Sequence, residues 1–563
     1  MQTKYIFITG GVASSLGKGI IAASLGQLLQ ARGYRITIQK FDPYINIDPG
    51  TLNPYEHGEC YVTADGMETD LDLGHYERFT GIETSRRNSV TTGQIYLSVI
   101  KRERRGDYLG KTIQVVPHIT DEIKRRMLCP DEDLDFVITE VGGTIGDIES
   151  QPFLEAIRQL RWELGAGRAL SVHLTYVPYL AAAGELKTKP TQASVKQLQG
   201  LGIQPEVLIL RTEHPLGDEL RAKVAHFCNV AKEAVIESQD MPSIYEVPAG
   251  MHRQGLDDII LRKMGIEPAV KPDLGPWLAF LERRRRAVKA VDVALVGKYD
   301  LQDAYKSIRE SLALAGTYNN IKVNIHFINS EGLTRRNVDA QLGTMAGVVI
   351  CPGFGQRGTE GKLIAAEYAR THDIPTFGIC FGMQMMVIEF ARNVLGLKDA
   401  TSAEFDSSAQ EAVIDLMEEQ KDIRQMGGTM RLGAYECELR EGSRTWEAYC
   451  REKGKVKSEE FASAIPSADN TAAANFSLFT HHFSLKERHR HRYEFNNRYA
   501  EAFEQHGMQC VGINPQADLV EIVEVSSLRW YIGTQFHPEY SSTVLHPHPL
   551  FMSFIKACKE WKN

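Results

Sequence analysis

The most reactive combination of residues in the sequence is a cysteine, a histidine and a glutamate. Cys380 is flanked by Gly378 and Gly382, and His537 and Glu539 lie near the C-terminus. Small neighbours allow a tight strand-to-helix turn that exposes a nucleophile, and the helix N-terminus lowers the pKa of a thiol. A histidine could then take the thiol proton and the glutamate could orient the imidazole. The pattern predicts ammonia release from glutamine; a buried structural cysteine is the alternative that the glycines disfavour.

A glycine-rich loop at residues 10–19 follows an apolar, strand-like stretch. Backbone N–H groups in such a loop, together with the start of a helix, bind polyphosphate, and Lys18 would neutralise phosphate charge. The loop departs from the usual P-loop because five residues separate Gly11 from Gly17, and because Gly19 replaces the hydroxyl residue that binds magnesium. The sequence predicts a nucleotide site with metal ligands elsewhere; a simple connecting turn is the alternative.

Two carboxylates are candidates for those metal ligands. Asp72 lies in a short acidic run, and Glu140 ends an apolar strand, where α/β sheets place ligands. Carboxylate oxygens suit Mg²⁺ that bridges phosphates. Residues 187–192 combine lysines and hydroxyls beside a proline, which suits a second triphosphate or, alternatively, a solvated loop.

These residues need large α/β domains to position them. With 563 residues, 43% hydrophobic and 24% charged residues and a formal charge of -8, the chain is typical of an ordinary multidomain soluble protein. The nine cysteines form no C-x-x-C pair, and no segment reaches the ~18 apolar residues of a membrane helix. We therefore expect a cytoplasmic protein with no nucleic-acid and no membrane partner.

Short β-branched runs alternate with helical patterns twice along the chain, which predicts two doubly wound α/β domains. We expect the first domain at 1–266 and a linker with a short helix at 267–290. The second domain is expected at 291–563, with an insertion at about 451–480.

The sequence resembles the CTP synthase family over nearly all of its length outside that insertion. The resemblance implies that 1–266 is a P-loop-like synthetase (amidoligase) domain and 291–563 a class I glutamine amidotransferase domain. The stretches that carry the resemblance are residues 10–19, 41–46, 70–79, 142–150, 187–192, 427–433 and 488–493. The resemblance implies a ligase of pyrimidine biosynthesis: ATP phosphorylates O4 of UTP, and ammonia channelled from glutamine hydrolysis displaces the phosphate to give CTP. It also implies Mg²⁺, GTP as an allosteric activator, CTP as a feedback inhibitor, and a homotetramer that can form filaments.

The resemblance assigns site residues by matching position. Those for ATP are Ser15, Leu16, Gly17, Lys18, Gly19, Ile20, Asp72 and Asp240, with Asp72 and Glu140 for the metal. Those for UTP or CTP are Ser14, Asp147, Ile148, Glu149, Lys187, Thr188, Lys189, Pro190, Thr191, Gln192 and Lys223. Those for glutamine are Gly353, Phe381, Gly382, Met383, Gln384, Glu404 and Arg492, with Cys380, His537 and Glu539 as the catalytic triad. Pro54, His57 and Cys60 match the ammonia passage, and Lys306, Phe354 and Arg357 match the surroundings of GTP.

One departure from the family pattern has a chemical consequence. The family loop reads Pro-Gly-Gly-Phe-Gly, whereas here Pro352 stands where an oxyanion-stabilising glycine is expected. Proline has no N–H, and losing one such donor costs about 10²–10³ in rate. We expect weakened glutaminase activity or GTP response, with the Phe381 N–H as the remaining donor and ammonia-dependent synthesis preserved.

A nucleotide-sensing or filament-forming protein with a decayed glutaminase half is an alternative function. An amidotransferase with another acceptor is a third, disfavoured by residues 147–149 and 187–192.

Overall fold

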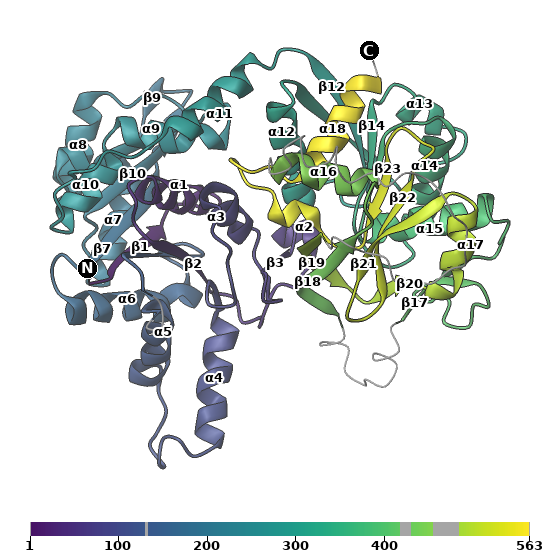
Figure 1. Ribbon diagram of the computed structural model, residues 1–563. Helices are drawn as coiled ribbons and strands as arrows, with labels where there is room; N and C mark the ends of the chain where they lie inside the picture. The colour runs from purple at the N-terminus through teal and green to yellow at the C-terminus, as the bar shows by residue number, and fades with distance from the viewer. Residues whose placement is uncertain (1, 130–132, 417–429, 454–482, 562–563) are drawn as a thin grey trace, which may run out of the picture. The chain divides into compact units, whose positions relative to one another are not determined.

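The computed structural model describes residues 2–129, 133–416, 430–453 and 483–561 (Figure 1). The chain forms two compact units, one of Met1–Leu52 with Glu68–Leu281 and the other of Asn53–Met67 with Glu282–Asn563. Within the described ranges, no helix has the length and apolarity needed to cross a membrane.

The first unit is built on a seven-stranded parallel sheet in the order β11-β10-β7-β1-β6-β2-β5. Its strands are β1 (Lys4–Gly10), β2 (Ile36–Asp42), β5 (Ser89–Thr91), β6 (Phe136–Val141), β7 (Ala169–Tyr176), β10 (Val207–Thr212) and β11 (Val235–Gln239). In the central strand, Tyr5 lies opposite Val137 on one side and Ala169 on the other. Helices cover both faces of such a sheet, which explains why these strands are nearly continuous apolar runs.

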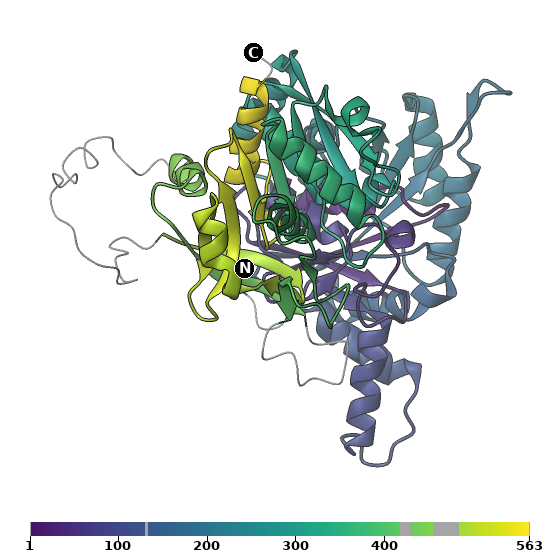
Figure 2. The same cartoon turned by 90° about the vertical axis from the view of Figure 1, so that its right-hand side faces the viewer.

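Helices cover the two faces of this sheet. One layer comprises α1 (Lys18–Gln30), α3 (Asp72–Thr80), α9 (Val247–Arg253) and α10 (Leu256–Lys263). The other comprises α4 (Thr92–Arg104), α5 (Thr120–Met127), α6 (Gln151–Leu164) and α7 (Lys189–Gly200), with α8 (Asp218–Cys228) packed on α7. α4 and the loop after it project from the body of the unit (Figures 1 and 2). A short hairpin pairs β8 (Tyr179–Leu180) with β9 (Glu185–Leu186).

The second unit is built on a nine-stranded mixed sheet in the order β13-β12-β14-β15-β23-β22-β21-β18-β19. Its strands are β12 (Ala290–Gly297), β13 (Lys322–Asn329), β14 (Gly347–Ile350), β15 (Thr376–Ile379), β18 (Arg431–Leu439), β19 (Ser484–His491), β21 (Met508–Asn514), β22 (Leu519–Val525) and β23 (Tyr531–Thr534). The run from β13 to β23 is parallel and the remainder antiparallel. A separate small sheet contains β16 (Thr401–Ser402), β17 (Ala412–Leu416) and β20 (Tyr493–Phe495).

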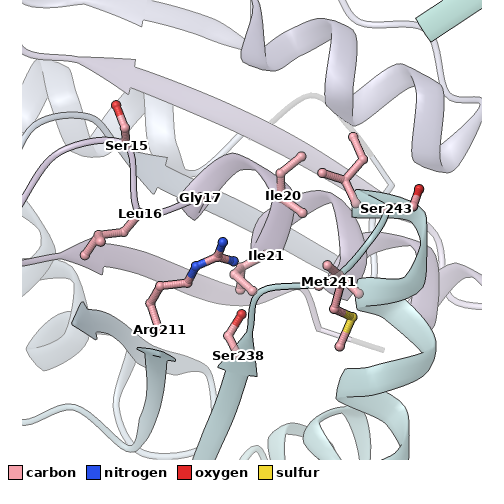
Figure 3. A pocket seen from close by; sticks show the side chains of 11 residues that line it. Ser15, Leu16, Gly17, Ile20, Ile21, Arg211, Ser238, Met241 and Ser243 are labelled. Atoms are coloured by element: carbon pink, nitrogen blue, oxygen red, sulfur yellow. The ribbon is translucent and has the colours of Figure 1, made fainter. Parts of the chain in front are cut away.

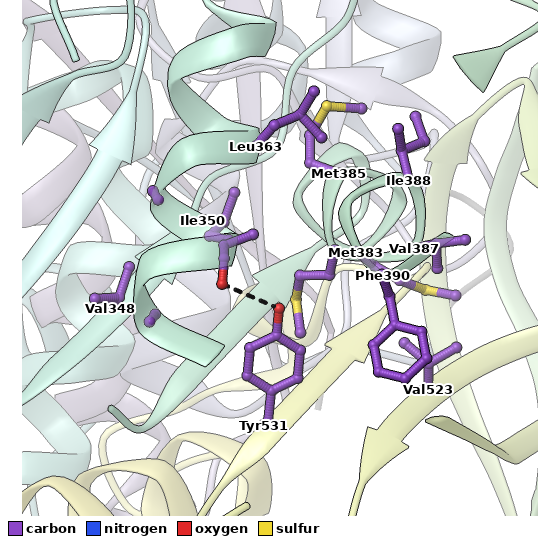
Figure 4. Close-up of a cluster of buried hydrophobic side chains, with 14 of the residues drawn as sticks. Val348, Ile350, Leu363, Met383, Met385, Val387, Ile388, Phe390, Val523 and Tyr531 are labelled. Carbon is purple, nitrogen blue, oxygen red and sulfur yellow. Dashed lines mark hydrogen bonds between the residues drawn. The ribbon is translucent and has the colours of Figure 1, made fainter. Parts of the chain in front are cut away.

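Two apolar cores lie on the faces of this sheet. On one face, α14 (Thr359–Thr371) and α15 (Phe381–Asn393) pack against β14 and β22 (Figure 4). There the buried Tyr531 donates its hydroxyl hydrogen bond to Ala366 O at 3.4 Å. On the other face, α12 (Lys306–Tyr318) and α18 (Pro549–Trp561) cover the strands. Both faces of the sheet are therefore covered by apolar side chains.

The region expected to link the domains contains α11 (Gly275–Arg286), which ends in the four arginines seen in the sequence. Cations in the last turn complement the helix dipole. The expected insertion at about 451–480 begins inside α16 (Arg444–Lys453) and otherwise lies outside the described residues, as do residues 427–429 of the family-like stretch 427–433.

Residues 53–67 belong to the second unit although they lie in the N-terminal part of the sequence. This segment contains α2 (Pro54–His57) and β3 (Tyr61–Val62). Tyr61 donates its hydroxyl hydrogen bond to Tyr540 O at 3.0 Å, and Ala64 O accepts from Ala434 N at 2.8 Å. The segment that carries Pro54, His57 and Cys60 therefore packs among the C-terminal strands.

Candidate active sites

Cys380 occupies a strained turn between β15 and α15. Its backbone has φ +53° and ψ -109°, a left-handed conformation that is unfavourable for a residue with a Cβ. A Cβ on Gly382 would lie 2.0 Å from Ile350 O, and one on Gly378 would lie 2.2 Å from the Met386 sulfur. Both glycines are therefore required sterically, as the sequence pattern predicts for a nucleophile elbow.

The predicted triad residues are all buried in the second unit. His537 Nδ1 lies 2.8 Å from Glu539 Oε1, a residue of the short 3-10 turn Pro538–Ser541. Burial disfavours the imidazolium, but the Glu539 carboxylate and the Cys380 thiolate together raise the pKa of His537 to about 10. His537 is therefore an imidazolium at neutral pH, which suits an acid that protonates a leaving group.

Two neighbours fix the environment of the Cys380 sulfur. The thiol donates to Arg490 O at 3.7 Å, and Gln535 Nε2 donates to Sγ at 3.7 Å. The Cys380 N–H donates to Thr534 O at 2.6 Å, which joins the turn to the end of β23. The nucleophile is thus held by strands on both sides of the turn.

The residues expected to bind glutamine lie around this turn. Gln384 is buried in the first turns of α15 and donates to Tyr493 O at 2.8 Å. Glu404 Oε1 accepts from Gly355 N at 2.7 Å, and burial raises the pKa of Glu404 although Arg492 and the Gly355 N–H oppose this. Arg492 is thus close enough to Glu404 to affect its pKa, so the region contains one cationic and one anionic side chain.

In the first unit, the glycine-rich loop joins β1 to α1 as predicted from the sequence. Lys18 is buried and donates to Gly143 O at 2.7 Å. Gly17 caps α1 with φ +91°, which only glycine adopts without strain. A Cβ on Gly19 would lie 2.2 Å from Asp72 Oδ1. The Asp72 carboxylate therefore occupies the space where other P-loops carry a hydroxyl side chain, which explains the departure from the usual motif.

The two predicted metal-binding carboxylates share a buried cation. Lys40 Nζ forms an ion pair with Asp72, lies 3.2 Å from Glu140 Oε1, and lies 3.9 Å from Asp42 Oδ1. Burial raises the pKa of Asp42 to about 6, whereas Lys40 holds the pKa of Asp72 below its usual value although burial opposes this. In the described part of the chain, no three His, Cys, Asp or Glu side chains group closely enough to hold a metal by themselves. The two carboxylates suit a Mg²⁺ ion whose other ligands are phosphate and water oxygens, and Lys40 shows that a cation is electrostatically favoured there.

A cavity of about 220 Å³ adjoins the phosphate loop (Figure 3). Loop and α1 residues Ser15, Leu16, Gly17, Ile20 and Ile21 line it together with Arg211, Ser238, Met241, Ser243, Ile244 and Val247. The Arg211 guanidinium points toward the loop, and it forms an ion pair with Asp240. Apolar walls beside a phosphate loop suit a purine base, and four of the residues expected at ATP lie here.

The residues expected to bind UTP or CTP lie on four segments of the first unit: Ser14 in the phosphate loop, residues 147–149, residues 187–192, and Lys223 in α8. Thr188 and Gln192 are joined by a 3.1 Å hydrogen bond at the start of α7, and Lys187 forms an ion pair with Glu185, which Lys223 also influences. Asp147 accepts from Thr144 N at 2.5 Å and from Thr144 Oγ1 at 2.9 Å. Ile148 is 81% exposed.

The residues expected near GTP lie in the second unit. Lys306 Nζ lies 2.9 Å from Glu310 Oε1, and Arg357 forms an ion pair with Glu331. Phe354 is 59% exposed, and Lys298 Nζ lies 4.4 Å from its ring centroid. These side chains leave an aromatic face and cations at the surface.

Comparisons with known proteins identify the family of the chain. The family model described as CTP synthase N-terminus matches residues 4–266, and the glutamine amidotransferase class-I model matches residues 300–557. A CTP synthase of Bacteroides fragilis is 65% identical over 559 residues, 99% of each chain. The chain belongs to the CTP synthase family. A CTP synthase of Porphyromonas gingivalis is 59% identical over 558 residues, 99% of this chain and 98% of that one. A solved structure described as Trypanosoma brucei CTPS glutaminase domain with bound acivicin is 33% identical, with TM-score 0.40, and covers 48% of this chain and 94% of that one.

Several polar residues of this CTP synthase family member were missed by sequence reasoning. Lys40 lies inside the buried strand β2, and Arg211 is the next-to-last residue of β10, so no local motif marks either one. Tyr76 donates its hydroxyl hydrogen bond to Glu140, and Tyr540 stacks on His537 at a centroid distance of 5.1 Å. A lysine or arginine within a predicted inner strand was the available signal, since such residues are buried only when paired.

Proposed function

We propose that the chain catalyses the ATP-dependent amination of UTP to CTP, with ammonia that its second unit releases from glutamine. The observation that carries the proposal is that two candidate sites of different chemistry occur in one chain. One is the elbow cysteine with its His537–Glu539 pair, and the other is the phosphate loop with Lys18, Lys40 and two carboxylates.

In the second unit, the Cys380 thiolate attacks the side-chain amide carbon of glutamine. His537, kept protonated beside Glu539, gives its proton to the departing ammonia. This leaves a thioester on Cys380 and a neutral imidazole. His537 then removes a proton from water, the resulting hydroxide attacks the thioester, and glutamate and the thiolate are regenerated.

In the first unit, the residues around the loop orient two triphosphates. Lys18 and Lys40 neutralise phosphate charge, and the cavity beside Ile20 and Met241 holds the purine of ATP. Asp72 and Glu140 would hold Mg²⁺, which shields the phosphate charge when bound. The γ-phosphoryl group passes to O4 of UTP, and ammonia displaces this phosphate at C4 to give CTP.

Finer parts of the proposal concern regulation and assembly. GTP activates glutamine hydrolysis near Lys306, Phe354 and Arg357, and CTP inhibits by binding near Asp147, Ile148 and Glu149. The protein acts in the cytoplasm as a homotetramer that can form filaments. The family to which the chain belongs supports these roles, together with the positions of the matching residues.

The test measures CTP formation from UTP, ATP and Mg²⁺, with glutamine or with ammonium chloride, each with and without GTP. We expect product with both nitrogen donors, and no product with either donor would exclude the proposal. Product with ammonium alone would instead favour the second candidate, a nucleotide-sensing or filament-forming protein with a decayed glutaminase. Pro352 is the observation that favours that candidate.

A further inference from the structure

A buried lysine lies directly beneath the loop that carries Pro352. Lys362 projects from the first turn of α14 and is 1% exposed. Its Nζ donates to Cys351 O at 2.6 Å and lies 3.3 Å from Pro352 O, which also accepts. The same ammonium lies 4.9 Å from the ring centroid of Phe381, the residue after the nucleophile. One cation therefore contacts both the Cys351–Pro352 segment and the residue that follows the nucleophile in the sequence.

Burying the charged ammonium of Lys362 costs desolvation free energy. Burial lowers the pKa of Lys362 to about 8, with Cys351 and Cys380 opposing the shift and Lys298 adding to it. A methionine would fill similar space without the desolvation of a charge. The charge must therefore provide something that an apolar side chain would not.

Peptide geometry links this lysine to an N–H group on the other side of the loop. In a trans peptide the carbonyl and the following N–H point in opposite directions. The Pro352 carbonyl points to Lys362, so the Gly353 N–H points away from it. The Phe354–Gly355 peptide of the same loop has this geometry. Its carbonyl, Phe354 O, accepts a hydrogen bond from Lys298 Nζ, and its N–H, on Gly355, donates to Glu404 at 2.7 Å.

We propose that Lys362 is a positioning residue that orients the Pro352–Gly353 peptide, so that the Gly353 N–H replaces the oxyanion donor that Pro352 cannot supply. The Gly353 and Phe381 N–H groups then stabilise the oxyanion of the tetrahedral intermediate on Cys380. Glutaminase activity is thereby retained despite the departure from the family loop. This inference rests on the glutamine hydrolysis proposed above.

The test uses the full chain with Lys362→Met and Lys362→Arg. For Lys362→Met we expect kcat for glutamine hydrolysis to fall by about 10²-fold, as for loss of one oxyanion donor, with KM changed less than about twofold. The γ-aldehyde of glutamate is a second probe, because thiolate addition to its C=O bond forms a C–S bond and an oxyanion. Its affinity should fall in parallel with kcat, because it mimics the transition state. Lys362→Arg should retain most of the wild-type kcat and most of the wild-type affinity for the aldehyde.

Three controls separate positioning from damage to the fold. Alkylation of Cys380 by iodoacetamide creates no oxyanion, so its rate should stay unchanged in Lys362→Met, as should ammonia-dependent CTP formation. Adding Pro352→Gly to Lys362→Met should restore kcat, because glycine supplies an N–H at position 352. The same substitution at the neighbouring lysine, Lys298→Met, should leave the ratio of aldehyde affinity to glutamine KM unchanged.

Wild-type kcat and aldehyde affinity in Lys362→Met would overturn the inference, as would equal loss of aldehyde affinity in Lys298→Met. If Lys362→Met does not fold, an inactive Lys362→Arg with wild-type thermal stability would also overturn it. Failure of the wild-type protein to release ammonia from glutamine would instead contradict the proposed function.

Discussion

The phenol ring of Tyr540 lies parallel to the imidazole of His537, with ring centroids 5.1 Å apart and planes inclined by 8°. The Tyr540 hydroxyl donates to Cys60 O at 3.0 Å, and Tyr540 O accepts from the Tyr61 hydroxyl at 3.0 Å. The Tyr540 ring therefore fixes the plane of the His537 imidazole, and residues 53–67 hold Tyr540 through hydrogen bonds to both its hydroxyl and its backbone carbonyl.

Removing the Tyr540 ring should impair glutamine hydrolysis. We expect Tyr540→Ala to lower kcat by about a hundredfold, because the imidazole loses the surface that orients it. Tyr540→Phe keeps the ring and loses one hydrogen bond, so about a fivefold effect is expected. Steady-state ammonia release measures both, with ammonia-dependent CTP formation as the control. A wild-type kcat in Tyr540→Ala would show that the stacking has no positioning role.

Stability should depend on pH through His537. Its pKa of about 10 in the folded protein exceeds the unfolded value of about 6.5, so its contribution is fully present below pH 6.5 and is lost as pH rises through 10. Glu539→Gln removes one cause of the raised pKa. The melting-temperature difference between wild type and Glu539→Gln should therefore be widest near pH 6 and shrink toward pH 10 in calorimetry. Glu560→Gln, at an exposed site on α18, is the control and should show a small, constant difference. A difference that grows with pH would contradict the proposed imidazolium.

A side chain at position 19 should abolish synthesis. In Gly19→Ser, the new Cβ would lie 2.2 Å from Asp72 Oδ1, so the carboxylate must move. We expect CTP formation to fall at least about tenfold with either nitrogen donor, because a displacement of about 1 Å at a reacting site can cost 10²-fold. Basal glutamine hydrolysis should persist. Gly217→Ala is the matched control, since that glycine has φ -66° and no heavy atom within 4 Å of an added Cβ. Equal synthesis rates in the two variants would refute a role for this contact.

Lys40→Met should make the fold depend on pH and on magnesium. Without the ammonium, Asp42, Asp72 and Glu140 repel one another, and loss of one partner of a buried ion pair costs about 3–5 kcal/mol. Burial raises the pKa of Asp42 to about 6, so this carboxyl is largely neutral at pH 5.5 and repels the other two less. The melting temperature of Lys40→Met should therefore fall less below that of wild type at pH 5.5 than at pH 8. Added Mg²⁺ should recover part of the melting temperature at pH 8. If the melting temperature of Lys40→Met, relative to wild type, changed neither with pH nor with Mg²⁺, this would count against a cation site at these carboxylates.

The parts of the sites that depend on neighbours in the sequence were predictable. The elbow at Cys380 needs small residues two positions away on each side, and His537 and Glu539 are two residues apart, so their contact follows from local geometry. The phosphate loop likewise joins adjacent elements. The sequence also revealed that Gly19 departs from the usual motif, but the reason required the approach of Asp72 from another helix.

The parts that depend on long-range packing were not predictable. Lys40 meets Glu140 across neighbouring strands, one hundred positions away in the chain. Tyr540 contacts Cys60 across 480 positions, and Lys362 reaches the loop only because α14 folds back against β14. No local periodicity encodes such approaches, because they arise from strand order and helix packing.

The assignment of residues 53–67 to the second unit limits how the protein can be divided. Arg488 Nη1 donates to the Tyr61 hydroxyl at 2.8 Å and to Val62 O at 3.1 Å, both buried contacts. A fragment that starts at residue 282 would lose these acceptors together with the support of Tyr540. The second unit is therefore made of two separate stretches of the sequence, and exchanging it between relatives requires three crossovers rather than one.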